Sequence, residues 1–106
     1  MDVSNKPWGD VSAADYEDAD TFCSACLIDA NPDGQDKTKS NCKLPVYDPG
    51  GALNRNAVHA AASALAGGRG GVQATPAQKK AAAKKLVKLY GVLNEDAPPS
   101  IKQMAQ

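Results

Sequence analysis

The chain is poor in the large side chains that build hydrophobic cores. Its 106 residues include five aromatic residues and sixteen Leu, Ile and Val together, whereas nineteen residues are Ala. A domain of this size buries a modest share of its surface, and alanine buries little apolar area per residue. Disorder throughout is not expected, because the net charge is zero and helical patterning is clear. We therefore expect a thin core that gains stability from a cross-link, a ligand or a partner surface.

Long apolar runs are absent as well. No segment approaches the length of a membrane span, and no charged leader followed by an apolar stretch precedes a cleavage site. We expect a soluble protein that is made in the cytoplasm and has no membrane partner.

Cysteine and histidine are scarce, with three cysteines and one histidine. Three cysteines are too few for a secreted disulfide framework, and the odd count leaves at least one thiol unpaired or bonded elsewhere. Cys23, Cys26, Cys42 and His59 have the spacing C-x2-C-x15-C-x16-H, which fits a Cys3His zinc site. A Cys23–Cys42 disulfide would instead close a long polar loop and contribute about 3 kcal/mol. We favour the disulfide slightly over zinc, with reduced core cysteines as the plain alternative.

The sequence contains no recognisable catalytic constellation. The acids around Glu17 lie at an exposed helix start, no serine belongs to a triad or elbow motif, and the glycines do not match phosphate-loop spacing. We expect no enzymatic activity and no cofactor. Lys80, Lys84 and Lys88 form a basic stripe that could follow a phosphate backbone. Because no base-reading pattern accompanies the stripe, we favour a solvated helix face over a nucleic-acid partner.

Charge is divided unevenly along the chain. Residues 1–36 contain nine acidic residues and one basic residue, whereas residues 37–106 contain eleven basic and three acidic residues. The two parts therefore carry −8 and +8. Such asymmetry can be neutralised within one fold or between copies packed head to tail. We favour two solvated faces of one small domain, with self-association as the alternative.

Hydrophobic periodicity and capping signals predict a mainly helical α+β fold with three helices and one β-hairpin. The expected helices cover about 13–25, 55–66 and 76–90, and the hairpin strands cover 26–29 and 42–47. Asn54 and Thr75 are the expected N-caps of the second and third helices, and Gly91 is expected to end the third. Pro45 should hold Leu44 in an extended conformation. Residues 67–74 are expected to form a flexible link.

Both ends of the chain are predicted to be extended arms around one compact domain. The arms cover residues 1–11 and 94–106, with a final helical turn expected after Pro99, and the domain covers 12–93. Trp8 in the first arm and Ile101 and Met104 in the second lie on segments too short to bury them locally. We therefore expect these three side chains to bind a partner surface.

One long segment resembles a known family. The string "LPVYDPGGALNRNAVHAAASALAGGRGG", with "CLID" before it and "AAAKKLVKLYGVLNEDAPPSI" after it, resembles a small domain of tailed bacteriophages and prophages. That domain occurs appended to head-maturation proteins such as prohead proteases, or encoded beside capsid genes. The similarity covers roughly residues 8–103. It carries no catalytic role, and this chain has no protease domain.

The resemblance implies a place in the phage head. We expect a non-enzymatic, capsid-associated structural protein of cement or minor capsid type, made in the host cytoplasm and present in the virion. Its partner would be the major capsid protein or another head protein, bound through the terminal arms. The alternatives are an assembly adaptor of the prohead protease and a small zinc-dependent nucleic-acid-binding module.

Overall fold

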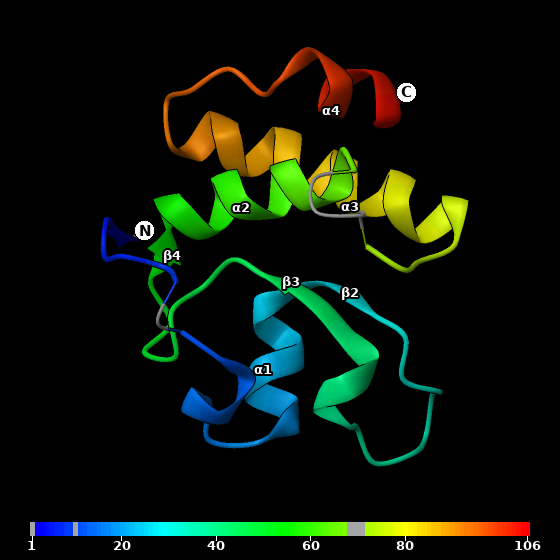
Figure 1. Cartoon of the computed structure of the whole chain (residues 1–106). Coiled ribbons are helices and arrows are strands. Elements are labelled where there is room, and N and C mark those ends of the chain that lie inside the picture. The colour runs from blue at the N-terminus through cyan, green and yellow to red at the C-terminus, as the bar shows by residue number, and fades with distance from the viewer. Residues whose placement is uncertain (1, 10, 68–71) are drawn as a thin grey trace. The chain divides into compact units, whose positions relative to one another are not determined.

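The computed structural model describes residues 2–9, 11–67 and 72–106 and has a small, mainly helical α+β fold (Figure 1). In chain order the elements are β1 (Val3–Ser4), η1 (Ala13–Asp15), α1 (Ala19–Ala25), β2 (Cys26–Asp29), η2 (Lys39–Asn41), β3 (Cys42–Pro45), β4 (Leu53–Asn54), α2 (Arg55–Leu65), α3 (Pro76–Val92) and α4 (Pro99–Met104). The fold class therefore agrees with the prediction from the sequence. Within the expected flexible link, residues 68–71 lie outside the described residues.

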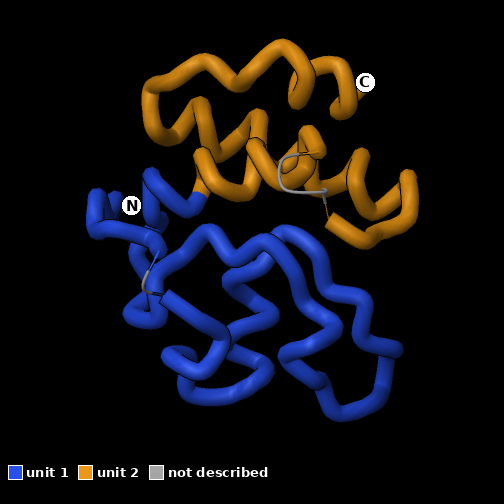
Figure 2. Tube along the Cα trace, in the orientation of Figure 1, with its two compact units in different colours: residues 1–57 blue, residues 58–106 orange. Residues whose placement is uncertain are grey.

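The chain divides into two compact units, Met1–Ala57 and Val58–Gln106 (Figure 2). The sequence pattern predicts one compact domain over residues 12–93. The boundary falls inside α2, so this helix contributes its first turn to unit 1 and the rest to unit 2. No helix among the described residues is both long enough and apolar enough to cross a membrane.

The first helix starts later than predicted. The expected helix over 13–25 is split into the 3-10 turn η1 and the α-helix α1. Asp15 Oδ2 accepts the backbone N–H of Ser12 at 2.8 Å and closes the turn. Asp18 is extended, and its carboxylate accepts the N–H of Thr21 at 2.7 Å, which begins α1. Because Ser12 and Asp18 each cap a separate start, the prediction was wrong about the beginning of the helix.

The predicted hairpin forms from β2 and β3, which pair antiparallel. Cys26 lies opposite Pro45, and Asp29 lies opposite Cys42. The second strand ends at Pro45, two residues earlier than predicted. Leu44 also departs from expectation, because its φ of 63° lies in the left-handed region and not in the extended region that a following proline favours.

A second, parallel strand pair was not predicted. In β1 and β4, Val3 lies beside Leu53 and Ser4 lies beside Asn54. The N-terminal segment is extended as expected, but it is held by unit 1 as an edge strand. It is therefore not a free arm at residues 3–4.

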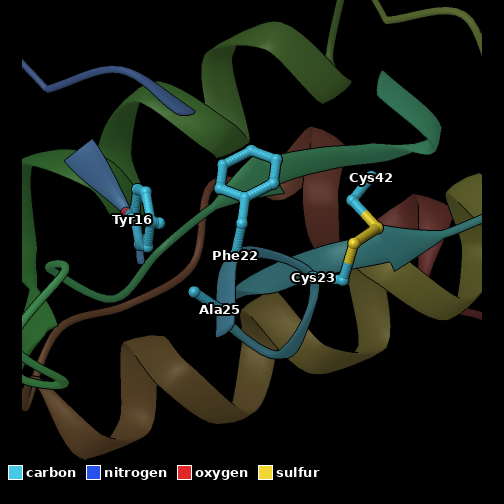
Figure 3. Packing of buried hydrophobic residues seen from close by; sticks show 5 residues of the cluster. All are labelled: Tyr16, Phe22, Cys23, Ala25 and Cys42. Carbon is cyan, nitrogen blue, oxygen red and sulfur yellow. A yellow bond between two sulfur atoms is a disulfide. The ribbon is translucent and has the colours of Figure 1, made fainter. Parts of the chain in front are cut away.

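The core of unit 1 gathers small and aromatic side chains around the hairpin. Figure 3 shows the buried side chains of Tyr16, Phe22, Cys23, Ala25 and Cys42 in one cluster. The rings of Tyr16 and Phe22 meet edge to face with their centroids 5.0 Å apart. Two aromatic rings and a cystine thus form this cluster, and unit 1 also buries the aliphatic residues Leu27, Ile28, Val46 and Leu53.

Unit 2 is helical, and its helices start as the sequence predicts. One face of α2 is buried and consists of Val58, Ala61, Ala62 and Leu65. Thr75 caps α3, with its hydroxyl accepting the N–H of Gln78 at 3.1 Å and Pro76 in the first turn. Gly91 does not end α3, which continues to Val92. Asn94 instead takes the left-handed conformation after the helix, with a φ of 59°.

The C-terminal segment is not an extended arm. Its residues Pro99–Met104 form α4, longer than the single turn expected there, and α4 packs against α3 (Figure 1). Ile101 is fully buried, at 0% exposure. The expectation that this segment cannot bury Ile101 locally is wrong, because the helix turns the residue inward and α3 supplies the surface that covers it.

Candidate functional site

Cys23 and Cys42 are joined by a disulfide, which is the pairing favoured slightly in the sequence analysis. Their Cα atoms lie 5.3 Å apart, within the usual range for a cystine. The bond fixes the end of α1 to the start of β3 across 19 positions of sequence. Both residues are buried in the unit 1 core, at 3% and 6% exposure. The disulfide therefore works as a structural cross-link beneath the polar loop between β2 and β3.

Asn31 forms hydrogen bonds within that polar loop, and its side chain lies next to the disulfide. Its Oδ1 accepts the N–H of Thr38 at 2.8 Å, and its Nδ2 donates to Asp29 Oδ1 at 2.8 Å. The same Nδ2 lies 3.2 Å from Cys42 Sγ. Asp29 also pairs with the ammonium group of Lys37. Lys37 first, then the N–H and amide of Asn31, lower the pKa of Asp29 to about 2.

The alternative zinc ligands are not gathered as the spacing suggested. Within the described ranges, the metal-capable group whose ligand atoms lie within 4.8 Å of one another is Cys23, Asp29 and Cys42, and both cysteines are committed to the disulfide. Cys26 is a free, half-buried thiol outside this group. Burial first, and then the charge of Asp29, raise its pKa to about 12, which makes it a poor thiolate ligand at neutral pH.

His59 belongs to a different set of contacts in unit 2. Its Nε2 lies 2.7 Å from Glu95 Oε1, and its ring stacks on Tyr90 with centroids 5.8 Å apart. The stacked ring joins α2 to Tyr90 near the end of α3, and the short contact joins it to Glu95 in the segment after α3. The side chain of His59 therefore contacts a carboxylate and an aromatic ring within unit 2 and helps to hold α2 against α3.

The basic stripe lies on α3 as predicted from its spacing. Lys80, Lys84 and Lys88 are all exposed. Their helix turns its buried side, which includes Ala82, Ala83 and Leu86, away from them. This arrangement is that of an amphipathic helix with a solvated face.

The three predicted partner-binding residues have different environments. Trp8 is half-buried and lies between the exposed residues Pro7 and Gly9. Met104 is half-buried near the end of α4, and Ile101 is fully buried. Of the three, Ile101 is not available to a partner in this conformation.

A pocket of about 310 Å³ opens between α1 and the turn at residues 48–51. Tyr16, Thr21, Ser24 and Ala25 line one side, and Tyr47, Asp48, Pro49 and Gly51 line the other. The Tyr16 hydroxyl donates to the carbonyl of Tyr47 at 2.6 Å. Burial is the main cause that raises the pKa of Tyr16 to about 12, with smaller effects of Cys26, Asp48 and Asp15. This hydroxyl therefore stays protonated and serves as a structural donor.

A second polar site is formed by residues 53–56, which we call the asparagine clasp. Asn54 is fully buried at 0% exposure, and its Oδ1 accepts the N–H of Ala57 at 2.8 Å as the N-cap of α2. Its Nδ2 donates to Asp48 Oδ1 at 2.8 Å and to the carbonyl of Lys6 at 3.2 Å. One side chain thus connects the helix start, the turn and the N-terminal segment.

The neighbours of Asn54 hold the same segment. Asn56 Nδ2 donates to the carbonyl of Lys6 at 2.9 Å and to that of Asn5 at 3.2 Å. Arg55 Nε donates to Asn5 Oδ1 at 2.9 Å, and the N–H of Leu53 donates to the carbonyl of Asp2 at 3.0 Å. In "LNRN" the sequence predicts only the helix cap. Two asparagines flanking a helix start were the available signal for the rest, but nothing local to them identifies residues 2–6 as their partner.

Comparisons with protein-family models, with curated proteins and with solved structures each find no match to this chain.

Proposed function

We propose that this protein is a non-enzymatic structural component of a bacteriophage head, of cement or minor capsid type, which binds the capsid lattice. The phage context comes from the resemblance of residues 8–103, with "LNRNAVHAAA" as its most specific string. The chemistry of the described residues is compatible with that role, because its polar clusters are occupied by internal contacts that stabilise the fold.

The observation that carries the proposal is the buried Cys23–Cys42 disulfide. Disulfides persist on virion surfaces and in other oxidising surroundings, and they are rare in proteins that stay in the cytoplasm. A protein that remains on a particle after release benefits from such a cross-link. An adaptor that acts on a prohead protease only inside the host would not keep it oxidised.

Mass spectrometry of purified virions tests this proposal. Digestion without reductant is expected to yield the peptide pair linked through Cys23 and Cys42. If the chain is missing from mature particles but present in proheads, the adaptor alternative takes its place. One zinc per purified chain, together with unfolding by a chelator, would favour the nucleic-acid-binding module.

The lattice contact is assigned to the N-terminal side of the chain around Trp8. Its aromatic ring is half-buried beside exposed Pro7 and Gly9, whereas Ile101 is covered by α3. Tryptophan is enriched among the residues that dominate protein interfaces. We expect Trp8→Ala to weaken binding to purified heads by about tenfold or more.

Val92→Ala is the matched control for that experiment, since Val92 is an apolar side chain that is 44% exposed on α3. Head binding is measured by co-sedimentation over a range of protein concentrations. Equal affinities of the Trp8→Ala and Val92→Ala variants would contradict the assignment of Trp8 as an anchor.

A further inference from the structure

The asparagine clasp binds an extended peptide mainly through its backbone. The carbonyls of Asp2, Asn5 and Lys6 all accept hydrogen bonds from residues 53–56. Val3 and Ser4 are half-buried in the parallel pair with β4, whereas the side chains of Asn5 and Lys6 are exposed. This is the geometry of strand addition, in which main-chain hydrogen bonds supply affinity and few side chains supply specificity.

The residues of the clasp are held in place by contacts with parts of the chain other than residues 2–6. The N–H of Asn54 donates to the carbonyl of Val46 at 2.9 Å, and its side chain is fixed by Asp48 and by the N–H of Ala57. Arg55 and Asn56 begin the helix α2 and take their positions from it. The binding groups are therefore placed by residues other than the N-terminal segment, as in a site formed before its ligand arrives.

The bound segment is connected to the rest of unit 1 by a short exposed stretch. Pro7 and Gly9 are exposed on either side of Trp8, and Pro7 has no N–H to contribute to a ladder. The contacts with the clasp join residues 48 to 51 positions apart, so their geometry does not depend on which copy of the chain supplies the segment. Exchange of such an element between identical chains is a low-cost route to association.

We propose that the asparagine clasp is a peptide-binding site that takes up residues 2–6 of a second copy of this chain, linking copies by exchanged N-terminal strands. The occupant is set by the contacts themselves. Arg55 Nε donates a hydrogen bond to the side-chain Oδ1 of Asn5, and the parallel register places Val3 beside buried Leu53. Every copy carries this segment, and this site needs no other partner. The inference does not depend on the phage role.

Cross-linking between differently labelled copies tests the exchange. One population carries Asn5→Cys and the other carries Arg55→Cys, both with Cys26→Ala so that the natural free thiol does not react. The populations are mixed at high concentration, equilibrated and treated with a short bismaleimide. We expect a covalent heterodimer that joins position 5 of one copy to position 55 of the other, identified by peptide mass spectrometry.

The matched control replaces Arg55→Cys with Lys88→Cys, an exposed position on α3. A heterodimer yield that is several times the control yield supports the exchange. If the two yields are equal while a single chain with both cysteines cross-links internally, the segment stays in its own copy and the proposal fails.

Native mass spectrometry gives a second readout that does not need introduced cysteines. Unlabelled and 15N-labelled full-length chains are mixed over rising concentrations, and mixed-label dimers are expected to appear. Asn56→Ala removes the donors to Asn5 and Lys6 from monomer and exchanged dimer alike, so it should change the share of mixed-label dimers little. Deletion of Gly9 should raise their share by shortening the connection. Monomers alone at every concentration would overturn the proposal.

Discussion

At the scale of single residues, Asn54 is a fully buried amide that connects three separate segments of unit 1. An amide group buried without partners is costly, and Asn54 avoids that cost by using both ends of its side chain. Its oxygen accepts from the first turn of α2, and its nitrogen donates to the turn at Asp48 and to the carbonyl of Lys6. Replacing it leaves the buried N–H of Ala57 without its acceptor and takes a donor away from half-buried Asp48.

We expect Asn54→Ala to lower the free energy of unfolding by about 3 kcal/mol, because it removes both the N-cap of α2 and the side-chain hydrogen bond to Asp48. Asn56→Ala is the control, since Asn56 is exposed and its loss should cost about 1 kcal/mol or less. Urea denaturation followed by circular dichroism measures both values. Similar destabilisation by the two substitutions would show that burial of Asn54 is not the cause.

Cys26 illustrates how burial controls a reactive group. Its raised pKa of about 12 leaves little thiolate near neutral pH. We expect iodoacetamide to alkylate Cys26 at least about 100-fold more slowly in the folded protein than in denaturant. Mass spectrometry of samples quenched over time gives both rates. Alkylation that is equally fast in both states would contradict the burial of this thiol.

At the scale of elements, the loop between β2 and β3 depends on Asp29 and its partners. The folded state lowers the pKa of Asp29 to about 2, so the ionised carboxylate is favoured by folding. Its stabilising effect is present above the unfolded value of about 4 and is lost as the pH falls through about 2. Acidification across that window should therefore weaken the loop before the rest of unit 1 changes.

We expect Asp29→Asn to reduce the loss of stability between about pH 5 and about pH 2.5, compared with the unchanged protein. Lys37→Gln is the matched variant, because it removes the largest cause of the pKa shift but keeps the carboxylate. Urea midpoints at several pH values measure the dependence. An identical pH dependence in all three proteins would mean that the Asp29 contacts do not contribute to it.

Elements whose signals are local were predictable from the sequence. Asn54 and Thr75 cap α2 and α3 as expected, because a cap depends on residues within one turn of it. The start of α1 was predicted wrongly because Ser12 and Asp18 are both acceptable caps, and nothing in the local pattern ranks them. Gly91 is likewise acceptable within a helix when a later residue, here Asn94, takes the left-handed conformation.

Features that depend on distant residues were not predictable from one sequence. The β1–β4 pair joins residues about 50 positions apart through only two residues on each strand, too few to produce a period. Ile101 looked exposed because its segment is short, and only the presence of α3 beside α4 buries it. In the candidate site, the sequence identified the cap of the clasp and the disulfide pair, but not the peptide that the clasp holds.

At the scale of the whole molecule, the two units carry opposite net charges and share the helix α2. Unit 1 contains ten acidic and five basic residues, whereas unit 2 contains two acidic and seven basic residues, giving −5 and +5. The helix α2 passes through the boundary without interruption. Because a helix propagates its hydrogen bonds cooperatively, this shared element should couple the unfolding of the two units.

The coupling can be followed with two probes. Trp8, the only tryptophan, reports unit 1 by fluorescence, and the far-UV circular dichroism signal comes largely from α3 and other helical residues of unit 2. We expect the two thermal transitions to coincide. Ala60→Pro, at an exposed position inside α2, should separate them and cost about 3 kcal/mol. Separate transitions in the unchanged protein would contradict the coupling.

The way in which the clasp holds residues 2–6 also bears on how this chain can evolve. Carbonyl oxygens are common to all twenty amino acids, so most substitutions in that segment leave its hydrogen bonds intact. The donors of Asn54 and Asn56 are side-chain amides, so substitution of either residue removes its hydrogen bonds to the segment. We therefore expect related chains to diverge quickly at the N-terminus while retaining both asparagines, so that a structurally constrained strand would look like an unconstrained tail in any alignment.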